Sequence, residues 1–254
     1  MRIKVFAGNW KMNMLPNEAI EYIERLTPLV QDTEHEVILC VPYIDLFYCL
    51  MNVQGTNIKI AAQNVHFAEK GAYTGEISAK MLKSIGVQYV IIGHSERREY
   101  FNETDESVNK KIKAAFAYGL IPIVCVGEKL AERENGMAEN VVTTQIKLDL
   151  DGLTNEQMKN TIIAYEPVWA IGTGKTATSE DANNMIQMIR KQIAELFGSD
   201  VAEQVIIQYG GSVKPENAKE LFTTSDIDGG LVGGASLDPD DFSKIIHYDN
   251  SLII

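Results

Sequence analysis

The chain has 254 residues, a net charge of −12 with histidine neutral, 45% hydrophobic residues and 23% charged residues. This length and composition suit a globular core that needs neither disulfides nor metals, and the negative charge disfavours nucleic acid and anionic lipid as partners. No apolar run could span a membrane and the N-terminus lacks a signal-peptide pattern, so we expect a cytoplasmic protein without a membrane partner. The three cysteines lack zinc-site spacing, so we expect reduced thiols and no metal.

The first part of the chain alternates short apolar runs with amphipathic stretches. A strand is predicted at Ile3–Asn9, and the apolar spacing of Pro16–Gln31 then predicts a helix. Further strands are predicted, in order, at Glu36–Val41, Ile58–Gln63 and Tyr89–Gly93. Most of these runs are almost continuously apolar, which is typical of parallel strands covered on both faces.

The middle of the chain continues the alternation. Thr104–Gly119 opens with a capping residue and an acidic first turn and stops at glycine, so it predicts a helix. A strand follows at Ile121–Val126. The long segment Glu128–Asn160 is predicted to hold two helices broken near Gly136.

The last part adds three more strands. They are predicted at Thr161–Glu166, Val205–Tyr209 and Gly229–Val232. The sequence Thr178–Asp181 resembles a capping box that opens a helix, and Pro215 suits the first turn of another.

Eight strands that alternate with helices form either a closed barrel or an open doubly wound sheet. The count of eight favours a closed (β/α)8 barrel, as does the lack of a Gly-rich dinucleotide fingerprint after the first strand. Nothing resembling a linker divides residues 1–254, so one α/β domain is expected. The short tail 248–254 could pack on the barrel or extend from it.

Unusual polar residues follow several of the predicted strands, where a parallel barrel places its catalytic groups. The segments that carry them are Gly8–Asn13, Gly93–Arg98, Tyr165–Pro167, Tyr209–Ser212 and Gly230–Ser236. We therefore expect a site at the C-terminal mouth of the barrel.

Six segments in this order carry a family resemblance: NWKMN, IIGHSERR, CVGE, AYEPVWAIGTGKTAT, YGGSV and LVGGASL. Together they extend from Gly8 to Leu237 and resemble the triosephosphate isomerase family. The resemblance implies a TIM barrel and a cofactor-independent isomerase of glycolysis and gluconeogenesis. It would interconvert dihydroxyacetone phosphate and D-glyceraldehyde 3-phosphate through an enediolate.

Three catalytic residues follow from the resemblance. Glu166, which alone would be read as an ion-pairing carboxylate, is expected to be the base that removes a proton next to the carbonyl. His94 precedes a predicted short helix, whose N-terminus disfavours imidazolium, and it is expected to act as a neutral electrophile. This role is the description usual for the family and is taken from it. Lys11 is expected to stabilise the developing negative charge.

The substrate-binding set implied by the resemblance combines polar side chains with glycine backbone. Its members are Asn9, Lys11, Gly172, Ser212, Gly233 and Gly234. Glycines allow backbone N–H groups to converge on a phosphate, although an isolated glycine is more often a tight turn. The sequence has Gly230 where the family often has a bulky apolar residue, which leaves the local barrel packing open.

The segment Val168–Thr176 is expected to be a lid. Pro167, Val168 and Trp169 lie at its start, and Tyr209 and Ser212 are expected to latch it when closed. Two acidic residues are expected in support: Glu96 orients Lys11 or the site, and Glu128 holds Trp169 when the lid is open.

A loop around Thr74, within GAYTGE, resembles the one by which the family forms homodimers. Thr74 would then reach towards Asn9 and His94 of the partner subunit. From the chain alone this segment is equally an exposed turn.

Two alternatives remain at this point. One is another phosphosugar isomerase or an aldolase-like barrel, although an aldolase needs a strand lysine or metal ligands that the predicted strands do not convincingly offer. The other is a non-catalytic paralogue that binds a metabolite or a protein. It would be expected to lack Glu166, His94 or Lys11, and all three are present.

Overall fold

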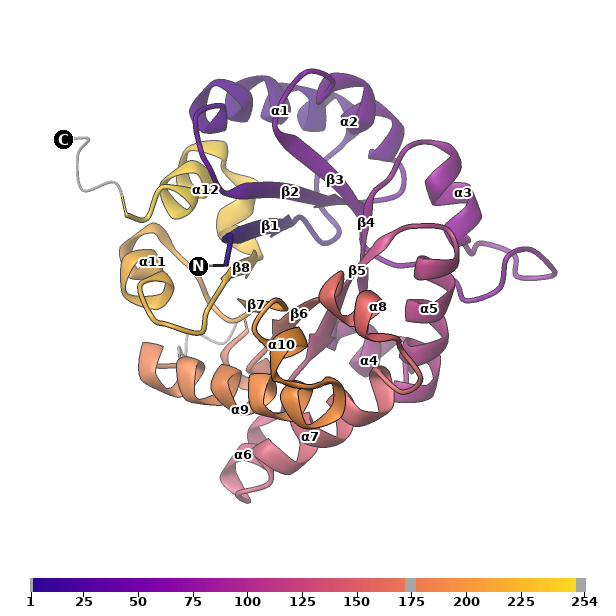
Figure 1. The fold of residues 1–254 in the computed structure, drawn as a ribbon. Coiled ribbons are helices and arrows are strands. Elements are labelled where there is room, and N and C mark those ends of the chain that lie inside the picture. The colour runs from indigo at the N-terminus through magenta and orange to yellow at the C-terminus, as the bar shows by residue number, and fades with distance from the viewer. Residues whose placement is uncertain (1, 172–176, 250–254) are drawn as a thin grey trace.

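The computed structural model describes residues 2–171 and 177–249, and its strands close into a parallel barrel in sequence order (Figure 1). The strands are β1 (Val5–Asn9), β2 (Glu36–Val41), β3 (Ile58–Ala62), β4 (Tyr89–Ile92), β5 (Ile121–Val126), β6 (Ile162–Tyr165), β7 (Ile206–Tyr209) and β8 (Gly229–Val232). Pairing of β1 with β8 completes the ring. The expected (β/α)8 barrel is confirmed.

Helices surround this ring. In chain order they are α1 (Pro16–Val30), α2 (Leu46–Asn52), α3 (Ala79–Ser84), α4 (Ser95–Tyr100), α5 (Asp105–Ala117), α6 (Leu130–Glu134), α7 (Ala138–Asp149), α8 (Asn155–Lys159), α9 (Ser179–Phe197), α10 (Ser199–Ala202), α11 (Pro215–Phe222) and α12 (Pro239–Ile246). Two 3-10 turns, η1 (Val168–Ala170) and η2 (Gly234–Leu237), follow β6 and β8.

The predicted helix boundaries have the expected chemistry. The Thr104 side chain caps α5, and the Thr178 side chain accepts a hydrogen bond from the Asp181 N–H at 3.0 Å to open α9. Among the described residues α9 has this half of the predicted capping box, without the reciprocal bond from the Asp181 side chain. Pro215 occupies the first turn of α11. The segment between β5 and β6 differs from expectation, because it holds three helices where two were predicted. The break near Gly136 is as predicted, and α8 adds one short turn capped by Thr154.

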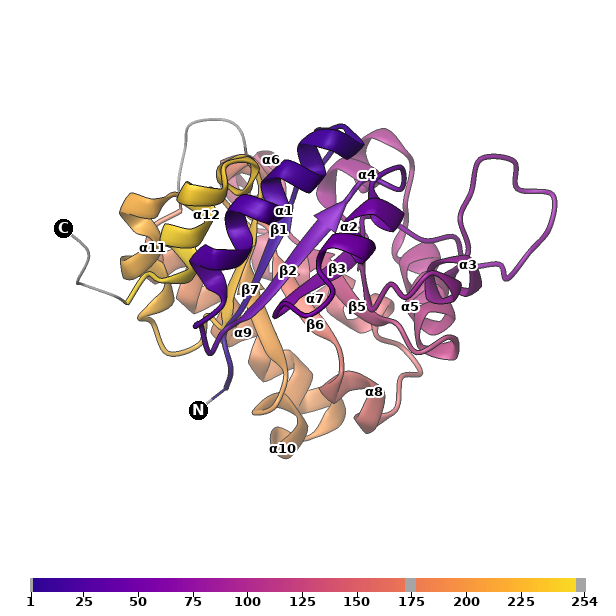
Figure 2. The same ribbon diagram turned by 90° about the horizontal axis from the view of Figure 1, so that it is seen from above.

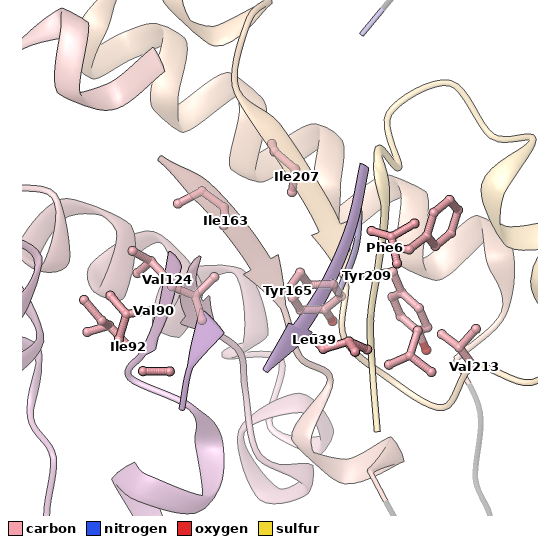
Figure 3. Packing of buried hydrophobic residues seen from close by; sticks show 14 of the residues in the cluster. Phe6, Leu39, Val90, Ile92, Val124, Ile163, Tyr165, Ile207, Tyr209 and Val213 are labelled. Atoms are coloured by element: carbon pink, nitrogen blue, oxygen red, sulfur yellow. The ribbon is translucent and has the colours of Figure 1, made fainter. Parts of the chain in front are cut away.

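The core has two layers, which follow from the alternation of side chains along each strand. One layer fills the barrel interior and consists of Val5, Ala7, Ile38, Cys40, Ala61, Tyr89, Ile91, Ile123, Cys125, Ile162, Ala164 and Leu231. The other lies between strands and helices and includes Phe6, Leu39, Val124 and Tyr165 (Figure 3). All three cysteines are buried and free.

Gly230 is compatible with this packing because an aromatic ring occupies the adjacent space. A Cβ added at Gly230 would lie 3.0 Å from Cζ of Phe222. Phe222 in turn meets Phe6 edge-on, with ring centroids 5.0 Å apart. The aromatic side chain from α11 thus fills the volume that a larger residue at 230 would need.

Tyr248 packs against the outer core layer, between the strands and the helices. Its ring stacks on His35 at 5.8 Å and meets Phe222 at 5.5 Å. The start of the predicted tail therefore packs on the barrel, whereas residues 250–254 lie outside the described part of the chain.

One loop projects from the barrel. The connection between β3 and α3 extends away from the ring in both views (Figures 1 and 2). Among the described residues, no helix combines the length and the apolar character needed to cross a membrane.

Candidate active site

The residues expected at the barrel mouth gather around one cavity of about 730 Å³. It is lined by Asn9, Lys11, His94, Glu166, Ser212, Gly233 and Gly234, together with glycines after β7. Each lies at or just after the C-terminal end of a strand, as the parallel topology requires. Gly172 lies outside the described residues, as do the other lid positions from 173 to 176.

Glu166 and His94 form the centre of this site. Oε1 of Glu166 lies 2.9 Å from Nε2 of His94, and Oε2 accepts the backbone N–H of Ser95 at 2.9 Å. The two residues are only 2% and 5% exposed, respectively. Each carboxylate oxygen of Glu166 therefore faces one donor, His94 Nε2 or the Ser95 N–H.

The electrostatics of the pair follow from this geometry. Burial raises the pKa of Glu166, but His94, the Ser95 amide and Lys11 together outweigh it and lower the pKa below the ordinary value. Burial lowers the pKa of His94, whereas the Glu166 carboxylate raises it and prevails. The carboxylate is thus held ionised, and its proximity opposes the neutral imidazole that the helix N-terminus favours.

His94 is oriented by the start of α4. Its Nδ1 accepts the backbone N–H of Glu96 at 3.2 Å, so this nitrogen carries no proton in the hydrogen-bond arrangement seen. Nε2 is then the donor directed at Glu166. An imidazole that accepts on one nitrogen and donates on the other is neutral, and it loses the helix contact on protonation.

Lys11 adopts an unusual backbone conformation. Its φ is +53°, which places a non-glycine residue in the left-handed region. Its N–H donates to Oδ1 of Asn9 at 3.0 Å, and Nε2 of Gln63 donates to its carbonyl at 2.9 Å. Nζ pairs with Oε1 of Glu96 at 2.6 Å. The expected support from Asn9 and Glu96 corresponds to these contacts.

The second side of the cavity is built from β7 and β8. Ser212 donates from Oγ to the carbonyl of Ala170 at 2.8 Å, which ties the loop after β7 to η1. A Cβ added at Gly233 would lie 3.5 Å from Cε of Lys11, so this backbone faces the lysine. The Gly233 backbone and the Lys11 side chain thus border the same part of the mouth cavity.

The first residues of the expected lid are held by contacts of Trp169 with residues that follow β5. Nε1 of Trp169 donates to Oε1 of Glu128 at 2.8 Å, and the hydroxyl of Tyr165 donates to the same oxygen at 3.1 Å. The Arg133 guanidinium lies 4.6 Å from the Trp169 ring centroid. The expected contact between Glu128 and Trp169 is therefore present, and Tyr209 is buried close by.

Sequence reasoning missed residues that hold the expected catalytic groups through the backbone. Gln63 bonds the carbonyls of Lys11 and Cys40, each at 2.9 Å, and the Ser95 amide bonds Glu166. Gln63 is the last residue of a predicted strand and directly follows β3 in the structure, so the same strand-end logic could have selected it. The Ser95 amide gave no such signal, because every residue other than proline carries one.

The loop around Thr74 is exposed, as expected for a protruding segment. Its base is packed by rings: His66 lies 4.3 Å from Phe67 and 4.2 Å from Tyr73 between ring centroids. No cluster of three or more potential metal ligands occurs in residues 2–171 and 177–249.

Comparison with known proteins gives one consistent result. The family model for triosephosphate isomerase matches residues 4–249. The triosephosphate isomerase of Clostridium perfringens (strain SM101 / Type A) is 57% identical over 248 residues, which cover 98% of this chain and all of that protein. The proteins of the same name from Clostridium botulinum (strain Eklund 17B / Type B) and Thermoanaerobacter sp. (strain X514) are 55% and 57% identical over the same shares of each chain.

Proposed function

The chain belongs to the triosephosphate isomerase family, and on that premise we propose that Glu166, His94 and Lys11 interconvert dihydroxyacetone phosphate and D-glyceraldehyde 3-phosphate. The reaction is an aldose–ketose isomerisation of glycolysis and gluconeogenesis, carried out in the cytoplasm. The observation that carries the proposal is the convergence of these three side chains on one cavity.

The first step is a proton transfer to Glu166. Its carboxylate takes a proton from C1 of dihydroxyacetone phosphate, the C–H electron pair forms the C1–C2 double bond, and the carbonyl π electrons move onto O2. To reach carbon, the carboxylate gives up the Ser95 N–H and the His94 contact that lower its pKa. Its basicity rises as those two donors are lost.

His94 and Lys11 act on the oxygens. Once Glu166 has turned to the substrate, Nε2–H of His94 is available to the carbonyl oxygen and then to the enediolate. A proton passes from O1 to O2, and Glu166 returns its proton to C2 to give the aldehyde. The Lys11 cation stabilises the negative charge that develops on oxygen.

The phosphate group is assigned to the far side of the cavity. The backbone of Gly233 and Gly234, with Ser212 and the Lys11 cation, borders this space. Backbone N–H groups that converge next to a cation suit a dianion. Asn9 completes the binding set, and Gly172 belongs to it by family resemblance alone. No metal or cofactor enters the scheme.

The start of the lid supports closure over the substrate. Pro167 and η1 lead directly from Glu166, and the Ser212 hydroxyl reaches the carbonyl of Ala170. Closure at this point would exclude water from the enediolate and so protect it from loss of phosphate. The buried Tyr209 hydroxyl and the Pro167 ring both border Gly211, so Tyr209 would support the closed position.

A coupled assay with glyceraldehyde 3-phosphate in EDTA tests the proposal. We expect rapid turnover by the wild type and a loss of kcat in both Glu166→Asp and Glu166→Gln. Aspartate is shorter and displaces the carboxylate, whereas glutamine has no basic carboxylate. EDTA should change nothing. A folded wild type without turnover, or a fully active Glu166→Gln, would refute the assignment.

The proposal includes a homodimer formed through the Thr74 loop. Large exposed apolar side chains gather on the connections after β1 to β4 and on the helices that follow. They are Met12, Leu15, Tyr43, Ile44, Phe47, Tyr48, Met51, Phe67, Tyr73, Met81, Ile85, Tyr100 and Phe101. Apolar exposure on this scale is typical of an association surface.

A second cavity offers a receptor for that loop. It measures about 300 Å³ and is lined by Asn9, Lys11 and His94 on one side and Tyr43 and Phe101 on the other. A loop tip from a partner would thus lie next to the catalytic residues. In a twofold dimer each subunit would both give and receive one loop.

Substitution of Thr74 tests the dimer. Thr74→Arg should dissociate it and lower kcat, because the larger charged side chain does not fit beside Lys11, whereas Thr74→Ser should remain dimeric. Sedimentation velocity at the assay concentration reports the state. A wild type that is monomeric and fully active would contradict the interface.

A further inference from the structure

Glu166 lines a smaller cavity in addition to the one at the mouth. This space of about 240 Å³ is shared with Gly127, Gln145 and Arg98. None of the last three residues takes part in the proposed proton transfers. Their contacts nevertheless lead directly to the backbone that carries Glu166.

Gly127 lies immediately against this backbone. A Cβ added there would be 1.7 Å from the carbonyl oxygen of Glu166, so only glycine allows the approach. The Glu166 N–H donates to the carbonyl of Val126 at 2.8 Å, and the Val168 N–H donates to the carbonyl of Glu128 at 3.1 Å. The chain around Gly127 and the chain around Glu166 therefore move together.

Gln145 holds the peptide groups of Gly127 that face away from β6. Its Oε1 accepts the Gly127 N–H at 2.8 Å, and its Nε2 donates to the Gly127 carbonyl at 3.2 Å. Successive peptide groups of a strand point to opposite sides. The neighbouring strand β4 ends at Ile92, opposite Val124, so it does not reach Gly127. The Gln145 amide supplies the two missing hydrogen bonds.

The same face of α7 makes a second attachment. Asp149 lies four residues after Gln145, and its Oδ2 is 2.7 Å from Nη2 of Arg98. Arg98 donates to the carbonyl of Gly93 at 2.8 Å and to that of Cys125 at 3.3 Å. Through Gln145 and Asp149, one helix face thus holds the end of β5 and, by way of Arg98, the end of β4 that leads to His94. In the ring β5 lies between β4 and β6, the two strands that carry His94 and Glu166.

We infer that Gln145 is a positioning residue for Glu166. Its side-chain amide, acting through Gly127, sets the height and angle at which the carboxylate enters the mouth. This inference rests on the proposed role of Glu166 as the base. Gln145 does not touch the mouth cavity, so it leaves the phosphate contacts unchanged.

The geometry makes the effect specific to the chemical step. Proton abstraction depends on placement of the carboxylate to within a fraction of an ångström, whereas phosphate binding depends on β7, β8 and Lys11. Loss of the clamp should therefore lower kcat and leave KM almost unchanged. A residue that only stabilised α7 would instead lower the unfolding midpoint and leave the kcat of the folded enzyme intact.

Gln145→Met tests this in the full-length wild-type background. Methionine has a similar length and no amide, so it removes both hydrogen bonds with little change in volume. We expect kcat to fall by roughly 10-fold to 10²-fold, since a misplacement of about 1 Å can cost about 10²-fold. KM and the inhibition constant of inorganic phosphate should stay near the wild-type values.

Thr144→Ala is the matched control. Thr144 is the preceding residue on α7 and is exposed. Within the described part of the chain its hydroxyl bonds only the carbonyl of Asn140, in its own helix, at 2.8 Å. Its kcat should equal that of the wild type. Urea unfolding of both variants shows whether any loss of rate merely reflects a loss of folded protein.

Gln145→Glu gives a second readout. A protonated carboxyl can accept from and donate to Gly127 as the amide does, whereas a carboxylate can only accept. The ratio of its kcat to that of the wild type should therefore fall as pH rises. The charged groups that line the same cavity are Arg98, Glu99, Glu103, Asp105, Lys129, Glu132 and Glu166. The wild type carries the same groups, so its pH profile, measured in parallel, is the reference for the ratio.

The outcomes separate the two proposals. If the wild type turns over and Gln145→Met keeps its kcat, the positioning role is wrong and the proposed function stands. A kcat ratio for Gln145→Glu that is constant with pH would also overturn the role. An inactive wild type, or a fully active Glu166→Gln, would overturn both.

Discussion

Lys11 combines a strained backbone with a catalytic assignment, so its substitution should separate stability from activity. Lys11→Gly and Lys11→Met both remove the ammonium group and its pairing with Glu96. They differ in the backbone, because glycine adopts the φ of +53° freely and methionine does not. Comparison of the two variants therefore isolates the strain.

The magnitude follows from the conformation. A left-handed non-glycine residue costs roughly 1–2 kcal/mol, and glycine returns about 0.4–1 kcal/mol of that through the entropy of the unfolded chain. We expect Lys11→Gly to be more stable than Lys11→Met by about 0.5–1 kcal/mol. Loss of the ion pair should cost each variant no more than about 1 kcal/mol, because the lysine and Glu96 side chains are 28% and 40% exposed.

Urea unfolding at one protein concentration measures the stability difference, and the coupled assay measures activity. Both variants should lose at least about 10²-fold in kcat/KM, the scale for removal of one electrostatic stabiliser. A Lys11→Met protein as stable as Lys11→Gly would refute the strain. Wild-type activity in either variant would refute the charge-stabilising role.

Two further predictions concern Glu166 and the barrel core. Ser95→Pro removes the backbone N–H that donates to Glu166, and it does so in the first turn of α4, where proline is tolerated. The lowered pKa of Glu166 should therefore rise, and the acid limb of kcat/KM should move to higher pH. An unmoved acid limb would show that this bond does not set the pKa of Glu166. Phe222→Ala should lower the free energy of unfolding by about 3–5 kcal/mol and leave kcat unchanged, because the ring is buried at the end of the barrel away from the mouth. A lowered kcat in the folded variant would contradict that separation.

The barrel was predictable from sequence because each strand is a compact apolar run between capped or proline-initiated helices. The ends of the individual strands and the shortest helices were harder to predict. β1 begins at Val5 where Ile3 was predicted, since pairing with β8 also begins at Val5. The extra helix Asn155–Lys159 was missed because five residues are too few for a periodic pattern.

The site was predictable as a set of strand-end residues, but its internal contacts were not. Glu166 and His94 are 72 residues apart by their numbers, and their contact exists only once β4 and β6 lie in one ring. The amide of Gln145 looks like any other polar group on a helix until the end of β4 leaves Gly127 without a strand partner. Such roles depend on register, which no local pattern contains.

The exposed apolar side chains and the glycines to which we assign phosphate binding lie on different parts of the ring. The connections after β1 to β4 carry the apolar surface, whereas the loops after β7 and β8 carry Ser212, Gly233 and Gly234. In the proposed dimer, substitutions that alter substrate binding can therefore accumulate in the later loops without disturbing the proposed contact between subunits. The earlier loops lack this freedom, because Lys11 and His94 share them with the apolar surface. This division makes the fold modular, and it indicates where a new specificity could evolve first.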